Sequence, residues 1–297
     1  KMKKLKTKRP RRNPVQFNEE VYQDVIDIKL NGWKGMKYIS VLVDVASGYV
    51  DMMPLRKKKH AIQHTIRWIR RWESKGMKKS KFWNTDGGGE FINDAFEELM
   101  MREGIHLEKG SPYTPESQGI VERANRTIED ALRKFFLQHN YLPLTLWPAI
   151  LQGISETLNG MWKKKIGMSS IKFVFGDGKC GMPEFCLGDL VNFNSKKPLP
   201  TEMKIEDKLR PKTLVGIYAG TESTKLARLI CFTQRGWRVY EVHPSRIVSK
   251  KYLFNNSMYN IMDIYGRELN ININKDINIS LYKNINNVDI YDNIFLN

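Results

Sequence analysis

Residues 21–55, VYQDVIDIKLNGWKGMKYISVLVDVASGYVDMMPL, decide the fold because they contain three strand-like runs in quick succession. VYQDVIDI (21–28) and the β-branched run KYISVLVDV (37–45) both have the composition of strands. YVDMMPL (49–55) follows a turn marked by Gly48. Short connections between strands are typical of an antiparallel meander. We therefore expect a sheet built on these three strands.

The segments that follow alternate between helical and strand-like patterns. The last helix, 120–140, is expected to come after a loop from Gly110 to Gly119 that is rich in Ser, Pro and Gly. In chain order we expect an apolar helical stripe over 61–72, a strand in KFWNTD (81–86), a helix capped by Asn93 and running through Met101, a strand in GIHLEKG (104–110), and the long amphipathic helix 120–140. This order predicts an α/β, RNase H-like domain, a mixed five-stranded sheet flanked by helices, although other α/β folds share parts of it.

The rest of the chain changes character twice. Residues 144–175 are expected to be helical, with Trp147 and Trp162 packed on the core. Short strands separated by turns over 183–250 are consistent with a small all-β barrel. The last 47 residues, 251–297, hold 12 Asn alternating with Ile. The predicted units are a basic flexible arm (1–15), the core with a helical extension (16–180), a β-barrel that contacts DNA or chromatin (181–250), and a disordered Asn-rich tail (251–297).

The charge of the chain points to nucleic acid. The net charge is +17, and residues 251–297 carry four Lys or Arg against five acids, so residues 1–250 carry about +18. The opening KMKKLKTKRPRRN has eight basic residues and no acid, and a second basic cluster covers 67–81. Such surfaces attract phosphate polyanions, although the arm alone could also be a nuclear-localisation signal. No apolar run reaches the roughly 18 residues of a membrane span, so no membrane partner is expected.

The three cysteines predict neither a disulfide framework nor a metal site. Cys180, Cys186 and Cys231 are scattered, no close Cys pair is present, and His243 has no His nearby. We expect free thiols in a reducing compartment, and no zinc.

Three acids stand where metal-dependent chemistry could be built. Asp24 lies in mid-strand, on the face that alternation gives to Tyr22 and Ile26, where an unpaired carboxylate is costly. Asp86 opens the turn DGGGEF, and Glu122 lies near the start of the long helix, with 35 residues (87–121) between the two acids. In the expected fold these acids can converge. Hard oxygen ligands would favour two Mg²⁺ or Mn²⁺ ions.

Other acids compete for the same roles. Asp27 faces away from Asp24 in the alternating strand, and Asp44 has the position of a turn former. Glu90 is interpreted as a helix-start acid or a neighbour of the metal ligands. Glu116 has the wrong spacing and is expected to face solvent.

Four stretches of the sequence together resemble the catalytic core of retroviral-type integrases. They are QDVIDI, KYISVLVDVASGYV, NTDGGGEF and SPYTPESQGIVERANRTI. The resemblance is to the DDE cores of LTR-retrotransposon and Maverick/Polinton-like elements, and it extends from about residue 21 to residue 175. It implies an enzyme that processes 3′ ends and transfers strands with Asp24, Asp86 and Glu122 as catalytic metal ligands. The segment 208–248 is more loosely similar to the region that follows such cores.

Further residues near these acids are candidates for DNA contact. Asn125 and Arg126 share the helix face of Glu122 and could touch phosphate, orient Glu122 or form ordinary salt bridges. Arg123 belongs to the same helix. Ser117 and Gln118, with Gly119, could form a loop that moves over substrate, or a polar loop without function.

The resemblance implies double-stranded DNA as partner, both element ends and target, with a homo-multimer acting in the nucleus. Two alternatives stay open: an RNase H-like nuclease without joining activity, and a domesticated, inactive DNA-binding protein. A module that only binds chromatin would account for 183–250 and leave the core unexplained.

Overall fold

The computed structural model describes residues 13–86, 88–91, 93–109, 115–177, 185–194, 213–221, 226–233 and 236–250. Most of the predicted basic arm and all of the predicted Asn-rich tail lie outside the described residues, as does Cys180. None of the helices in these ranges is long and apolar enough to cross a membrane.

A mixed five-stranded sheet forms the first layer, in the order β3-β2-β1-β4-β5. β1 pairs antiparallel with β2, which pairs antiparallel with β3, whereas β4 runs parallel to β1 and β5 parallel to β4. The strands are β1 (Glu20–Gly32), β2 (Met36–Asp44), β3 (Val50–Leu55), β4 (Phe82–Thr85) and β5 (His106–Lys109). This sheet, with its helices on both faces, is an RNase H-like fold, as the sequence predicted.

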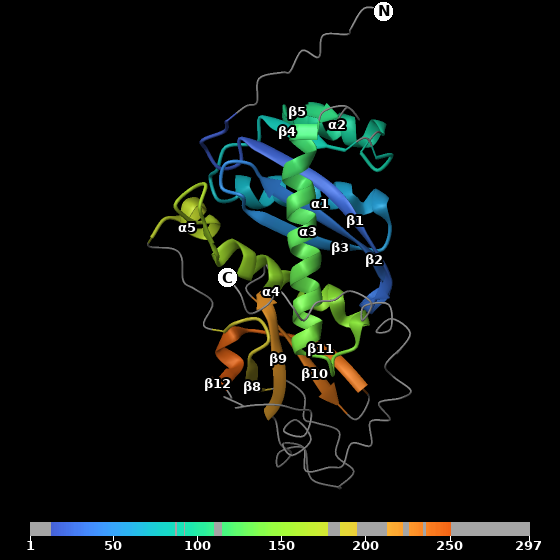
Figure 1. Ribbon diagram of the computed structural model, residues 1–297, viewed down its shortest axis with the longest axis vertical. Coiled ribbons are helices and arrows are strands. Elements are labelled where there is room, and N and C mark those ends of the chain that lie inside the picture. Colours follow the sequence, from blue (N-terminus) through green and yellow to red (C-terminus); the bar gives the residue numbers. More distant parts are fainter. Residues whose placement is uncertain are drawn as a thin grey trace, which may run out of the picture.

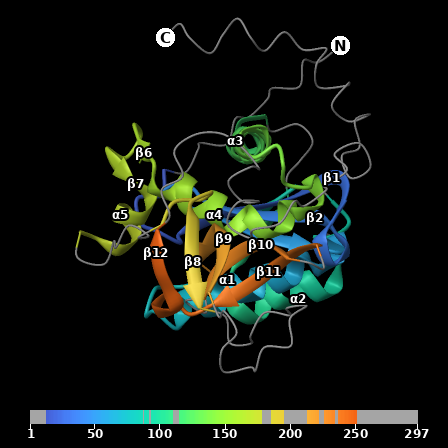
Figure 2. The same cartoon turned by 90° about the horizontal axis from the view of Figure 1, so that it is seen from below.

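Helices cover both faces of this sheet (Figures 1 and 2). The helices are α1 (Ala61–Glu73), α2 (Asp94–Glu103), α3 (Pro115–Gln138), α4 (Trp147–Gly160) and α5 (Ser170–Phe175), with single 3-10 turns at Trp33–Gly35, Lys58–His60, Leu144–Leu146 and Pro244–Arg246. α1 and α2 pack on one face through Trp68 and Phe96. α3 and α4 pack on the other through Ile128 and Ile150. Phe135 and Phe136 are buried there, as expected.

Two expectations from the sequence are wrong. α3 begins at Pro115, so residues 115–119 are helical and the expected loop over 110–119 is shorter. Proline suits the first turn of a helix because its missing N–H would have no partner there and its φ is already helical. Trp162 is 66% exposed, because the chain after α4 turns into a hairpin of β6 (Trp162–Lys163) and β7 (Met168–Ser169). Trp147 is buried, as expected.

A second five-stranded sheet is antiparallel, in the order β11-β10-β9-β8-β12. Its strands are β8 (Leu190–Asn194), β9 (Thr213–Thr221), β10 (Ala227–Thr233), β11 (Gly236–Val242) and β12 (Ile247–Lys250). The predicted strands of 183–250 are therefore present. Among the described residues the edge strands β11 and β12 do not pair with each other, so the unit is described as a sheet and the predicted barrel is not shown.

The second sheet packs directly on α4 (Figure 1). Ile217, Ala219 and Ile230 join the same buried cluster as Val41 and Ile150 of the first unit. The carboxylate of Glu156 accepts hydrogen bonds from Thr221 N at 2.8 Å and from the Tyr218 hydroxyl at 3.3 Å. The two units therefore share this hydrophobic cluster, and the second sheet has a further cluster of its own.

Candidate active site

β1 places Asp24 on the sheet face that α3 covers. Tyr22 and Ile26 pack into the cluster on the α3 face, whereas Val21 and Val25 pack into the cluster around α1 and α2. The alternation expected from the sequence thus holds through the middle of β1. Asp24 shares the face of Tyr22 and Ile26 and is half-buried.

Asp86 lies beside Asp24 because β4 runs parallel to β1. The last paired residues of these two strands are Gln23 and Thr85, and each is followed directly by one of the two acids. Asp86 is an exposed residue, yet the surrounding protein limits the hydration of its carboxyl group. This desolvation, together with the negative charges of Asp24 and Glu90, raises the pKa of Asp86 above its ordinary value.

The turn after β4 brings a further carboxylate close to Asp86. The Gly88 N–H donates to Asp86 Oδ1 at 3.2 Å. A Cβ at Gly88 would lie 2.8 Å from Glu90 Oε2 and 3.1 Å from Asp86 Oδ1, so a side chain at this position would collide with both acids. Glu90 Oε1 also lies 3.6 Å from Lys58 Nζ. Glu90 therefore belongs to the surroundings of Asp86, one of the two interpretations left open by the sequence.

α3 contacts Asp24 through Asn125. Asn125 Nδ2 donates to Asp24 Oδ2 at 2.6 Å, while Asp24 Oδ1 accepts from the N–H of Val25 at 2.7 Å. Asn125 Oδ1 is buried and has no hydrogen-bond partner among the described residues. Glu122 is exposed and lies three residues earlier on α3, so it shares the helix face that Asn125 turns toward Asp24.

The donor set suits a hard divalent cation. Asp24, Asp86 and Glu122 offer carboxylate oxygens, and the unpartnered Asn125 Oδ1 adds an amide oxygen. None of the three acids forms an ion pair with a Lys, Arg or His in the part of the chain that the structure describes. No three His, Cys, Asp or Glu of the described residues already lie together as a complete metal cage. The oxygens thus fit the chemistry of Mg²⁺ or Mn²⁺.

The competing acids have structural roles. Asp44 is completely buried, and its Oδ2 accepts from Ser47 N at 2.7 Å and from Ser47 Oγ at 2.6 Å. It is a turn former, as expected. Asp27 pairs with the exposed Lys29 at 2.7 Å. The side chain of Glu116 lies outside the described residues.

Sequence comparisons find regions similar to this chain in Pol polyproteins. No family model matches the chain. The chain is 31% identical over 140 residues to the retrovirus-related Pol polyprotein from transposon TNT 1-94 of Nicotiana tabacum, which covers 47% of this chain and 10% of that protein. It is 34% identical over 101 residues to the Pol-related polyprotein of the mouse intracisternal A-particle MIA14, which covers 33% of this chain and 11% of that protein. Its homologues are thus Pol polyproteins of retroviruses and retrotransposons.

The chain spans about a tenth of the length of these two Pol polyproteins, so the homologous region is one part of much larger proteins. Among solved structures, the HTLV-2 integrase catalytic core domain in complex with magnesium (trimeric form) is 24% identical, with a TM-score of 0.40. That match covers 55% of this chain and 99% of that chain.

The other DNA-contact candidates lie on α3. Arg126 is exposed, and so is Arg123, whose Nε donates to the Gly119 carbonyl at 2.8 Å. Ser117 and Gln118 fall in the first turns of α3, so the mobile loop expected there is replaced by helix, and their side chains lie outside the described residues.

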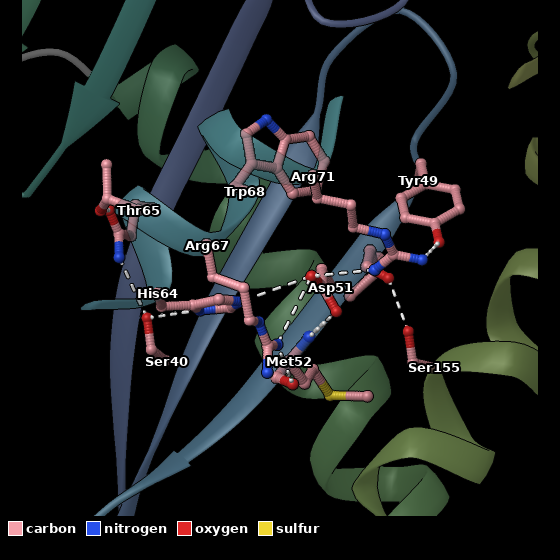
Figure 3. Close-up of polar contacts among 12 residues, drawn as sticks. Ser40, Tyr49, Asp51, Met52, His64, Thr65, Arg67, Trp68, Arg71 and Ser155 are labelled. Carbon is pink, nitrogen blue, oxygen red and sulfur yellow. Dashed lines mark hydrogen bonds and ion pairs between the residues drawn. The ribbon is translucent and has the colours of Figure 1, made fainter. Parts of the chain in front are cut away.

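One polar cluster of the first unit was missed from the sequence. Asp51 of β3 is buried against α1, where its Oδ2 lies 3.4 Å from Arg71 Nη1, 3.6 Å from Arg67 Nη2 and 3.6 Å from His64 Nε2 (Figure 3). Burial alone would raise the pKa of Asp51, but His64 and the two guanidinium groups outweigh it and hold this pKa well below its ordinary value. Burial, with the same two arginines, lowers the pKa of His64. The spacing of His64, Arg67 and Arg71 on one helix face was the available signal.

Proposed function

We propose that this chain is an integrase-type core that processes the 3′ ends of a transposable element and joins them to target DNA. The observation that carries the proposal is the hydrogen bond from Asn125 to Asp24, 101 residues apart in sequence. This bond joins Asp24 of β1 to the α3 face that bears Glu122, and Asp86 directly follows β4, the strand beside β1. These contacts support a site that draws on all three acids.

In this proposal Asp24, Asp86 and Glu122 would hold two Mg²⁺ or Mn²⁺ ions. Such ions would neutralise the carboxylates and stabilise the attacking and leaving oxygens of an in-line phosphoryl displacement. The Asn125 amide orients the Asp24 carboxylate. The negative charges of Asp24 and Glu90 repel the Asp86 carboxylate and contribute to its raised pKa. A bound cation would offset this repulsion, which favours occupancy of the site.

The proposed substrates are DNA duplexes, both element ends and target. Arg123 and Arg126 present positive charge on α3 next to Glu122, where phosphate contacts would position a DNA strand. Joining two ends to one target implies a homo-multimer, and chromosomal DNA as target implies action in the nucleus.

The test combines purified protein, Mn²⁺ or Mg²⁺, a labelled duplex pool with randomised termini, and a plasmid target. Labelled strands covalently joined to the plasmid would support the proposal, and sequencing of the junctions would report the preferred ends. Shortened strands alone would point to a nuclease. Retarded but chemically unchanged duplexes would point to an inactive DNA-binding protein. Either of these two results would overturn the proposal.

Variants assign the site in the same assay. We expect Asp24→Asn, Asp86→Asn and Glu122→Gln each to abolish joining, because each removes a negative oxygen ligand. Asp27→Asn is the matched control, since it makes the same change on the same strand in a side chain that pairs with Lys29. Joining that survives all three site substitutions together would show that the site lies elsewhere.

A further inference from the structure

Gln23 is buried directly behind the two strand-borne acids of the proposed site. Its side chain is 1% exposed and points toward α1, on the opposite sheet face from Asp24. Gln23 precedes Asp24 on β1, and its partner across the strands, Thr85, precedes Asp86. No step of the proposed chemistry uses this residue.

All four hydrogen-bonding positions of the Gln23 amide are occupied. Oε1 accepts from Thr65 Oγ1 at 2.6 Å and from Trp83 Nε1 at 3.0 Å. Nε2 donates to Ser40 Oγ and to the Ala61 carbonyl, both at 3.1 Å. A primary amide offers two donors and two acceptor sites, so this one has a single satisfied orientation.

These four bonds tie β1 to three other elements at the level of the site. Trp83 belongs to β4, Ser40 to β2, and Ala61 and Thr65 to α1. The bond to Trp83 matters most, because the pairing between β1 and β4 ends at Gln23 and Thr85. Asp86 lies beyond the last paired residue, so its place relative to Asp24 depends on how firmly the end of β4 is held.

The partners of Gln23 are themselves buried. Trp83, Ser40 and Thr65 are each completely buried, so loss of the amide would leave the indole N–H of Trp83 without water to replace it. The two hydroxyl groups would each keep one partner, because Ser40 Oγ also lies 3.0 Å from His64 Nδ1 and Thr65 Oγ1 lies 3.4 Å from the Ala61 carbonyl oxygen. Relief of that cost requires movement of β4 or α1 relative to β1. A movement of β4 changes the separation of the Asp24 and Asp86 carboxylates directly.

We propose that Gln23 is a positioning residue that sets the spacing of Asp24 and Asp86 through its bond to Trp83, and thereby the affinity of the site for a divalent cation. This inference rests on the proposed function only in taking Asp24 and Asp86 as cation ligands. Gln23 itself touches neither cation nor DNA.

The test measures Mn²⁺ binding directly, by water-proton relaxation, in the whole chain and without DNA. Gln23→Met keeps the size of the side chain and removes its hydrogen bonds, and we expect the Mn²⁺ dissociation constant to rise about tenfold or more. The half-saturating Mn²⁺ concentration for joining should rise in parallel. Thermal unfolding, followed by circular dichroism, checks that the variant is folded.

Asn159→Leu is the matched control for a purely structural loss. Asn159 is a buried amide of α4 that accepts from Val50 N at 2.8 Å and donates to Val50 O at 2.7 Å, on edge strand β3, away from Asp86. We expect it to lower the melting temperature and leave Mn²⁺ affinity unchanged. Unchanged Mn²⁺ affinity in Gln23→Met, or an equal loss in Asn159→Leu, would overturn the inference. If Gln23→Met does not fold, Thr65→Val, which removes one of the four bonds, is expected to weaken Mn²⁺ binding by a smaller factor, and no weakening would overturn it.

The two proposals fail in different ways. If Asp86→Asn binds Mn²⁺ as tightly as the wild type does, the assignment of the metal site to Asp86 is refuted. Loss of Mn²⁺ in Asp86→Asn with normal binding in Gln23→Met would refute only the role of Gln23. Wild-type protein that binds Mn²⁺ and joins no DNA would refute the proposed function and leave the role of Gln23 to be decided by the binding data.

Discussion

At the scale of single residues, two buried carboxylates of this chain are surrounded by partners. Asp51 has a side chain only 2% exposed and three basic partners, while Arg67 and Arg71 keep part of their surface in water. The buried Asp44 carboxylate accepts hydrogen bonds from its own turn instead, and burial still raises the pKa of Asp44 to about 6. A charge without such partners would be expelled or neutralised.

Asp51→Asn tests the energetic role of the cluster around Asp51. We expect a loss of about 2–3 kcal/mol in the free energy of unfolding at pH 7, less than for a fully buried pair because Arg67 is partly hydrated. Because the folded-state pKa of Asp51 is lowered, its contribution is present at neutral pH and is lost as the pH falls below about 4. Urea unfolding across a pH series should therefore give a shallower acid-side decline for the variant. An identical decline, or no change at pH 7, would contradict this; Asp27→Asn is the exposed control.

At the scale of elements, the contact between α4 and β9 depends on two glycines. A Cβ on Gly220 would lie 2.3 Å from Gly153 N, and Gly220 has a φ of +108°. A Cβ on Gly153 would lie 2.6 Å from Leu187 Cδ1 and 3.0 Å from the Ala219 carbonyl oxygen. The absence of side chains at this crossing lets helix and strand backbones touch.

Gly220→Ala should push α4 and β9 apart. We expect a loss of about 2–4 kcal/mol in stability, from steric overlap together with the strained φ. Gly236→Ala is the matched control, since Gly236 has a φ of +84° with nothing within 4 Å of its added Cβ and so reports strain alone. Calorimetry and hydrogen exchange of α4 measure the effect. Equal losses in the two variants would mean that the close approach contributes nothing.

Some boundaries of helices and strands can be predicted from local sequence patterns alone, and others cannot. The Asn93 side chain accepts from Phe96 N and begins α2 at the predicted place, because a cap is a contact between near neighbours. The start of α3 at Pro115 was missed because Ser, Pro and Gly favour loops and helix starts alike. Trp162 was misplaced because apolar character does not reveal which way a hairpin points.

At the scale of the whole molecule, the two sheets share a core that includes Ile39 and Val41 of one sheet and Ile217 and Ile230 of the other. Units joined by such a core should not melt separately.

A calorimetric scan should therefore show one unfolding transition, with equal calorimetric and van't Hoff enthalpies. Ile217→Ala, which deletes buried volume from the second sheet, should lower the temperature of that same transition when it is followed by the fluorescence of buried Trp68 and Trp72 in the first unit. Two resolved transitions would mean that the units unfold independently. The same conclusion would follow if Ile217→Ala left the midpoint of the fluorescence transition unchanged.

The net charge of +17 predicts salt-sensitive DNA binding. If the chain neutralises six to ten phosphates, duplex affinity should fall by roughly 10³-fold or more between 50 and 200 mM salt. The reason is that the entropy gained by releasing counterions into solution falls as the salt concentration rises. Fluorescence anisotropy with a labelled duplex measures the slope. Asp86→Asn should leave the slope unchanged, and a flat salt dependence would argue against electrostatic DNA binding.

The sequence by itself determined the order of strands and helices, the basic character and the three candidate acids, because periodicity, caps and charge are properties of neighbouring residues. It also indicated which face of β1 carries Asp24, since alternation follows from strand geometry. Tertiary structure alone decided the bond from Asn125 to Asp24, the enclosure of Asp51 by α1, the saturated amide of Gln23, and the crossing of Gly153 with Gly220. Each joins segments far apart in the chain, and their meeting depends on how helices pack on sheets, which no local pattern specifies.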